Sequence, residues 1–113
     1  MVSYTFHEHD WKQFRAKLPG WQEAYMDRLN REYIKLLSSD SSPSEKFWEL
    51  EKRIRNDKRS VGVQAEIRRS MMENNIISLL NCGAISLNDL DGFSDDFQER
   101  IKYLFSTREK YFE

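Results

Sequence analysis

The sequence places two histidines and two carboxylates at consecutive positions, in the run His7-Glu8-His9-Asp10. Alternate histidines on an extended chain can share a metal ion through their imidazole nitrogens. A structural or catalytic site needs at least one further ligand, and the chain has no other histidine and only one cysteine, Cys82. We therefore predict no metal site and no cofactor, and we interpret residues 1–9 as a flexible or extended arm.

A second group of carboxylates lies in the acidic stretch 87–99, which partly matches a calcium-binding loop. With Gly92 at the sixth loop position, Asp89 and Asp91 fall at the third and fifth positions. The first position is then Leu87 and the twelfth is Gln98, so the ligands that calcium needs most are missing. Helix capping explains these carboxylates better than metal binding does.

Nucleophilic catalysis is not predicted either. A serine or cysteine nucleophile needs a neighbouring base, and no histidine follows His9 in the sequence. Cys82 is expected at the C-terminal end of a helix, where the helix dipole disfavours the reactive thiolate. We therefore predict that the protein is not an enzyme, and we interpret Cys82 as a small buried side chain.

The strongest functional pattern is a stripe of basic residues beside an aromatic ring. Its members are Trp48, Lys52, Arg55 and Arg59 on one predicted helix, with Arg68 and Arg69 on the next as an extension. At 100° per residue the first four lie within about 60° of one another. Such a stripe suits a phosphate backbone or an acidic protein. The alternative is a solvated face on which lysine and arginine stems cover Trp48.

Four main helices and two short ones are predicted to position these residues. The main helices are expected over residues 21–38, 43–58 and 63–82 and from residue 95 onward, and the short ones over residues 10–18 and 86–90. Asp10 is the expected N-cap of the first short helix, which Pro19-Gly20 ends. Ser42 as N-cap, Pro43 as the first helical residue and Glu45 closing a capping box are typical of a helix start, and Ser86 with Asp89 forms a second capping box.

The stretch 71–85 is the predicted centre of the fold. Ile76, Ile77, Leu79 and Leu80 cover more than half of the helix circumference, which is typical of a helix enclosed on all sides. Gly83 then ends this helix with a positive φ. The apolar face turns by about 160° within residues 63–82, which we interpret as a helix exposed in its first half and enclosed in its second.

Helix 43–58 is expected to bury Phe47, Leu50 and Ile54 against the other helices. Together these patterns predict an all-α protein, a small irregular helical bundle formed by residues 1–113 as a single domain. The single cysteine and the lack of a signal peptide or a long apolar run favour a cytoplasmic protein without a membrane span.

The charge is distributed unevenly although the net charge is only −1. Residues 73–99 carry six acidic side chains and no lysine or arginine, and the segments on either side of them carry a basic excess. Our first hypothesis is a protein-interaction or oligomerisation module, in which the acidic segment of one copy approaches the basic stripe of another. The alternative is a nucleic-acid-associated accessory protein that uses the basic stripe.

Overall fold

The computed structural model describes the backbone of residues 6–112 and the side chains of residues 6–107. Its elements are α1 (Glu8–Leu37), α2 (Pro43–Asp57), the 3-10 turn η1 (Arg69–Met71), α3 (Met72–Asn81), the 3-10 turn η2 (Leu87–Leu90) and α4 (Asp95–Phe112). No strand occurs in the described part of the chain. The predicted class, an irregular bundle of four main helices with two short ones, is therefore confirmed.

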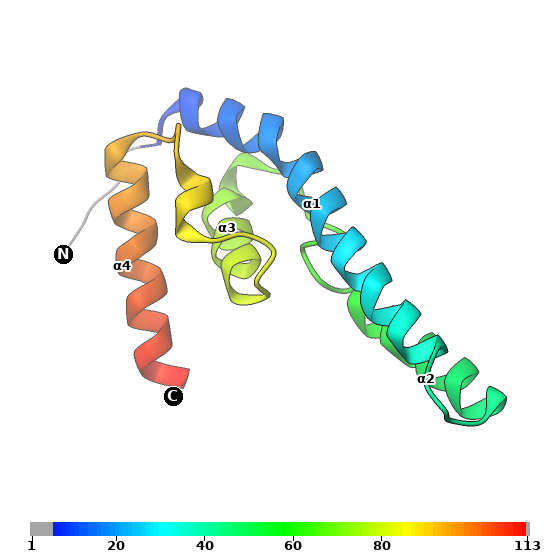
Figure 1. Ribbon diagram of the computed structural model, residues 1–113. Helices are drawn as coiled ribbons and strands as arrows, with labels where there is room; N and C mark the ends of the chain where they lie inside the picture. The colour runs from blue at the N-terminus through cyan, green and yellow to red at the C-terminus, as the bar shows by residue number, and fades with distance from the viewer. Residues whose placement is uncertain (1–5, 113) are drawn as a thin grey trace.

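The molecule has two parts that share α1 (Figure 1). Residues 8–21 of α1 pack with α3, η2 and α4, and we call this part the head. The rest of α1 pairs with α2, and we call residues 25–37 together with α2 the hairpin; at its start Arg28 still donates to the Cys82 and Gly83 carbonyl oxygens at the end of α3. The result is an elongated molecule whose longest dimension is 53 Å.

The predicted break at Pro19-Gly20 is wrong, since α1 continues through both residues. A proline inside a helix removes one backbone hydrogen bond and costs about 3 kcal/mol. Packing on both sides of Pro19 offsets this cost. Leu18 is buried in the head, and the ring of Trp21 stacks on Phe93 with the ring centres 6.4 Å apart.

The N-cap of α1 is His7 and not the predicted Asp10. The helix therefore includes residues 8 and 9, which were predicted to belong to the arm. Residues 1–5 lie outside the described residues. Asp10 is instead buried in the first turn, where its carboxylate accepts hydrogen bonds from the Ser94 backbone N–H at 2.7 Å and the Ser94 hydroxyl at 2.6 Å. This carboxylate therefore joins the start of α1 to the start of α4.

The predicted helix 63–82 is shorter than expected, because α3 begins only at Met72. The amide of Asn75 donates to the Glu66 carbonyl oxygen at 2.9 Å and holds the preceding backbone in a non-helical path. The 160° turn of the apolar face thus has a simple cause: the first half of that pattern is not helical. Ile67, in this connection, is exposed.

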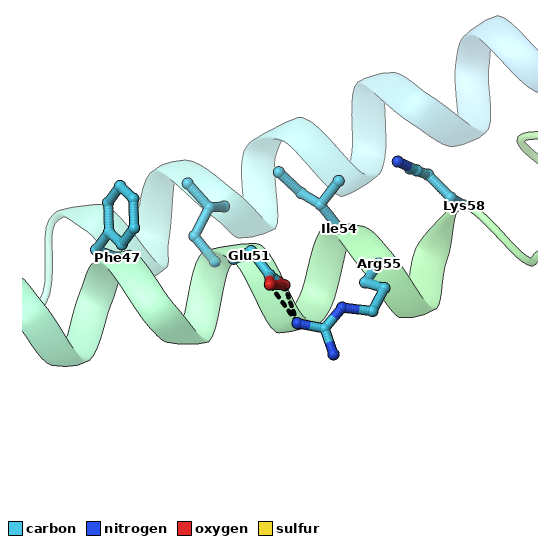
Figure 2. A pocket seen from close by; sticks show the side chains of 6 residues that line it. Phe47, Glu51, Ile54, Arg55 and Lys58 are labelled. Atoms are coloured by element: carbon cyan, nitrogen blue, oxygen red, sulfur yellow. Dashed lines mark hydrogen bonds and ion pairs between the residues drawn. The ribbon is translucent and has the colours of Figure 1, made fainter.

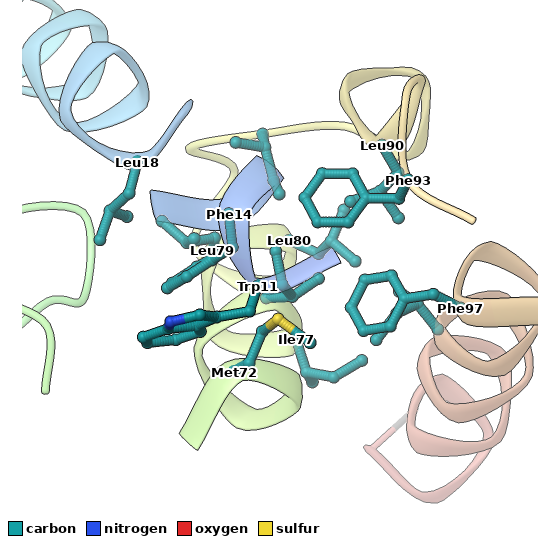
Figure 3. Packing of buried hydrophobic residues seen from close by; sticks show 13 residues of the cluster. Trp11, Phe14, Leu18, Met72, Ile77, Leu79, Leu80, Leu90, Phe93 and Phe97 are labelled. Atoms are coloured by element: carbon teal, nitrogen blue, oxygen red, sulfur yellow. The ribbon is translucent and has the colours of Figure 1, made fainter. Parts of the chain in front are cut away.

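The apolar residues in the second half of the predicted helix 63–82 lie at the centre of the head, as predicted. Ile76, Ile77, Leu79 and Leu80 are all buried. Figure 3 shows Ile77, Leu79 and Leu80 among side chains from α1, η2 and α4. The remaining buried members of the cluster are Trp11, Phe14, Leu18, Met72, Ile85, Leu90, Phe93, Phe97 and Ile101. Gly83 has the predicted positive φ, and the capping box of Ser86 with Asp89 is formed.

Gly62 and Gly20 give a matched pair of predictions for stability. A Cβ atom at Gly62 would lie 2.3 Å from the buried ring of Tyr25, so Gly62→Ala must displace that ring. We expect a loss of about 1–3 kcal/mol in the free energy of unfolding. At Gly20, inside α1, nothing lies within 4 Å, and Gly20→Ala should add about 0.5–1 kcal/mol. Urea denaturation of both variants checks this, and equal effects would contradict the packing at Gly62.

Candidate interaction surface on the hairpin

Polar contacts hold α2 against α1. The hydroxyl of Tyr33 on α1 donates a hydrogen bond to the carboxylate of Asp57 on α2. Arg53 donates to Glu32 at 3.0 Å, and its guanidinium lies over the Tyr33 ring, 5.4 Å from the ring centre. At the N-terminus of α2, the Ser42 hydroxyl accepts from the Glu45 backbone N–H, as the predicted N-cap requires.

The apolar side chains of α2 are not buried, which contradicts the prediction for Phe47, Leu50 and Ile54. None of the residues of α2, all of which the structure describes, is buried. Phe47 is 62% exposed, Ile54 is 37% exposed and Leu50 is half-buried. The reason is geometric: α1 covers only one side of α2, and the head is too far from α2 to cover the other sides (Figure 1).

These side chains form one continuous surface with residues of α1. We call this surface the hairpin face; its members are Met26, Tyr33 and Leu37 on α1 and Phe47, Leu50 and Ile54 on α2. Figure 2 shows Phe47, Ile54 and Lys58 in one row on α2, with α1 behind them. Leu37 belongs to the same stripe as Tyr33, one helical turn further along α1.

Two adjoining hollows mark the hairpin face. One is about 440 Å³ and lies along α2 from Phe47 to Lys58. The other is about 290 Å³ and lies between the two helices, where Met26 and Tyr33 meet Ile54. Ile54 and Lys58 line both hollows, so the surface is continuous across the hairpin.

The environment of Tyr33 gives a testable pH dependence. Burial, and then the hydrogen bond to Asp57, raise the pKa of the Tyr33 phenol to about 12. Because the folded pKa is raised, the stabilisation from this contact is complete below pH 10 and is lost as the pH rises through about 12. Subtracting the tyrosinate absorbance of Tyr33→Phe from that of the unaltered protein should give a titration midpoint near 12. A midpoint near 10, the value of an ordinary tyrosine, would contradict the contact.

The structure brings together only part of the predicted basic stripe. Trp48, Lys52 and Arg55 are exposed on α2 and Arg59 on the turn after it, while Arg55 pairs with Glu51. The ring of Phe47 contacts Trp48 edge to face, with the ring centres 5.0 Å apart. Of these four residues, Arg55 lines a hollow of the hairpin face and Trp48 contacts Phe47, whereas Lys52 and Arg59 line hollows elsewhere.

Arg68 and Arg69 lie elsewhere in the molecule. Arg68 pairs with Glu66 at 2.7 Å. Arg69 pairs with Glu8 at 2.6 Å and lies over the Trp11 ring, at the opposite end of α1 from the hollow that Trp48 shares with Leu36. At 1.5 Å per residue these two ends of α1 are about 42 Å apart. The extension of the stripe into residues 68 and 69 is therefore not formed.

The histidine and carboxylate clusters are spread over separate contacts in the head. His7 pairs with Asp96 at 2.9 Å, and His9 bonds to the Gly92 carbonyl oxygen. Hydrogen bonds from Ser94 and then His7 lower the pKa of the Asp96 carboxyl. Among the described residues, no three histidine, cysteine, aspartate or glutamate side chains lie close enough to share a metal ion. Cys82 is half-buried rather than buried.

The acidic segment 73–99 makes some of its ion pairs within the chain. Glu73 accepts from Arg100 at 3.2 Å, in addition to the pair of Asp96 with His7. Asp89 accepts from the backbone N–H of Ser86 in the capping box. Part of the charge asymmetry in the sequence is thus balanced inside the head.

Comparisons with protein-family models, with curated proteins and with solved structures found no match. No helix in the described part of the chain combines the length and the apolar character needed to cross a lipid bilayer. What the chain does must therefore be argued from the hairpin face and its surroundings.

Proposed function

We propose that this protein is a non-enzymatic protein-interaction module and that the hairpin face is its binding surface. The observation that carries this proposal is the exposure of Phe47, Ile54 and Leu37 on two helices that the structure holds side by side. Contiguous apolar surface costs free energy in water, and on a monomeric protein it is a mark of a protein–protein contact.

The construction of the hairpin supports this function. A helix of the length of α2 is marginal by itself in water, so its contacts with α1 are needed to keep it folded. Those contacts include Tyr33 with Asp57 and Arg53 with Glu32, which leave the row of Phe47 and Ile54 uncovered. Phe47, which is largely in solvent, therefore adds little to folding and is available for a partner helix.

The bordering charges favour a partner with acidic groups around an apolar centre. Lys58 lines both hollows of the hairpin face, and Arg55, which pairs with Glu51, lines one of them, whereas Lys52 and Arg59 line hollows elsewhere on the molecule. Charged residues at the rim of an interface chiefly steer association and set orientation, while buried aromatic residues supply most of the affinity. Phe47 is the residue best placed for that second role.

A nucleic-acid-associated function has less support. Three of the five basic residues of the predicted stripe, Arg55, Arg68 and Arg69, already pair with carboxylates. The last two are also remote from Trp48, so the stripe offers no continuous track for a phosphate backbone. Binding to DNA or RNA whose affinity falls steeply with salt would favour this alternative over ours.

Site-specific photo-crosslinking in the native cell tests the proposal. A photoreactive amino acid is placed at Phe47 on the hairpin face, and in a control at Ile67, which is 54% exposed but lies outside it. We expect a discrete covalent adduct from position 47 and none from position 67. Adducts that are absent at both positions, or equally strong at both, would contradict a binding role for the hairpin face.

A further inference from the structure

We infer that the occupant of the hairpin face is a second copy of this chain, bound with its α2 antiparallel to the first. This inference rests on the proposed function and adds to it the identity of the partner and the register of the contact. The observation behind it is the order of the charged side chains along the edge of α2 that α1 does not cover. Glu51 and Arg55 line the same hollow as Phe47 and Ile54, at that edge (Figure 2).

The order of these charges makes the edge complementary to itself. From Phe47, Glu51 lies about 40° and Arg55 about 80° round the helix, so both border the apolar row. If two α2 helices lie antiparallel about a two-fold axis at the level of Arg53, Glu51 of each copy faces Arg55 of the other. Within one copy Arg55 pairs with Glu51, so association exchanges the two pairs within the copies for two pairs across the axis, as an isologous contact repeats each pair.

The same register also places the ring of Trp48 favourably. Trp48 of one copy lies level with Lys58 of the other, because both are five residues from the axis. An ammonium group beside an indole ring is a stabilising contact. In a parallel arrangement Glu51 would face Glu51 and Arg55 would face Arg55, which is repulsive. The charge order therefore selects the antiparallel dimer.

The size of the hairpin face sets the expected strength. The 15 residues of α2 span about 22 Å, and two packed helices are about 20 Å wide. The face thus offers roughly 450 Å² on each copy, or about 900 Å² for the pair. This lies below the 1,200–2,000 Å² that is typical of stable complexes, so we expect a reversible dimer with a Kd in the micromolar range.

Sedimentation velocity from about 1 to 500 μM tests the dimer on the full chain, across the concentration range that a micromolar Kd requires. We expect the mass to rise from 13.6 kDa toward twice that value. Phe47→Glu should weaken the association by about thirtyfold or more, because each copy loses the most exposed aromatic side chain of its apolar row from the interface. Ile67→Glu, the matched control outside the hairpin face, should leave it unchanged. A monomer at every concentration would overturn the inference.

Charge reversal tests the register. Glu51→Arg or Arg55→Glu alone should weaken self-association by about tenfold, since each creates two like-charge contacts across the axis. A mixture of the two variants should recover the original affinity as a heterodimer, because every contact is again between opposite charges. A folding defect in either variant would not be repaired by mixing. Weakening without recovery would overturn the antiparallel register.

The crosslinking experiment separates this inference from the proposed function. If position 47 captures a protein other than this chain and the purified chain stays monomeric, the second-copy inference fails while the interaction function stands. If position 47 captures nothing and the chain stays monomeric, both fail. An adduct of twice the chain mass together with recovery on mixing supports both.

Discussion

Leu79→Asp is expected to leave the protein without a stable head at 25 °C. Leu79 has no exposed surface and lies among side chains from α1, η2 and α4 (Figure 3). The substitution removes about 2–3 kcal/mol of apolar burial and places a carboxylate where no partner is available, which costs several kcal/mol more. A chain of this length has a total stability of roughly 6–17 kcal/mol, so the loss approaches or exceeds the smaller value.

Leu37→Asp is the matched control for that experiment, because it makes the same chemical change on the 47% exposed Leu37. We expect a loss below about 1 kcal/mol, most of it from an acidic side chain near the C-terminus of α1. Far-UV circular dichroism during thermal unfolding gives both values. A similar Tm for Leu79→Asp and the unaltered protein would show that the head does not have its centre at α3.

Asp10→Ala is expected to produce the second largest loss, about 2–4 kcal/mol in the free energy of unfolding. The Asp10 carboxylate is buried and accepts from both the backbone N–H and the hydroxyl of Ser94. Hydrogen bonds to a charged group contribute more than neutral ones, and removing the acceptor leaves the Ser94 N–H without this partner. The start of α4 then keeps the pair of Asp96 with His7 but loses its buried polar connection to α1.

Asp40→Ala, in the exposed loop between α1 and α2, is the control and should change stability by no more than about 0.5 kcal/mol. Guanidinium denaturation at constant pH measures both variants. If Asp10→Ala and Asp40→Ala had the same unfolding midpoint, the carboxylate of Asp10 would not be joining the two helices.

Local signals in the sequence predicted the head well. The continuous apolar character of residues 76–80, the positive φ at Gly83 and the capping box at Ser86 each depend on a few neighbouring residues. The structure confirms all three because packing in the head agrees with these local preferences.

Predictions that depended on distant contacts were less successful. Pro19 and Gly20 read as a helix break, because nothing local shows that Leu18 and Trp21 pack on the same head. Likewise, the apolar spacing of Phe47, Leu50 and Ile54 indicates an amphipathic helix but not what covers it. Only the position of α2 relative to the head shows that this stripe is open to solvent.

The basic stripe illustrates the same limit. Helical periodicity grouped Trp48, Lys52 and Arg55, and all three are exposed on α2, but Arg55 lines a different hollow from the other two. It could not place Arg69, since that required knowing that residues 61–68 do not continue a helix and that Glu8 lies nearby. The surface that we propose for binding includes Phe47, Leu50 and Ile54, which the sequence had predicted to be buried.

The central claim is that the apolar residues of α2 serve binding rather than folding. The most direct test is the urea-unfolding midpoint of Phe47→Glu, measured at a low protein concentration so that self-association does not contribute. Because the Phe47 side chain is largely in solvent, we expect the free energy of unfolding to stay within about 1 kcal/mol of the unaltered value. A loss of about 3 kcal/mol or more, the cost of replacing a buried phenylalanine, would contradict the claim.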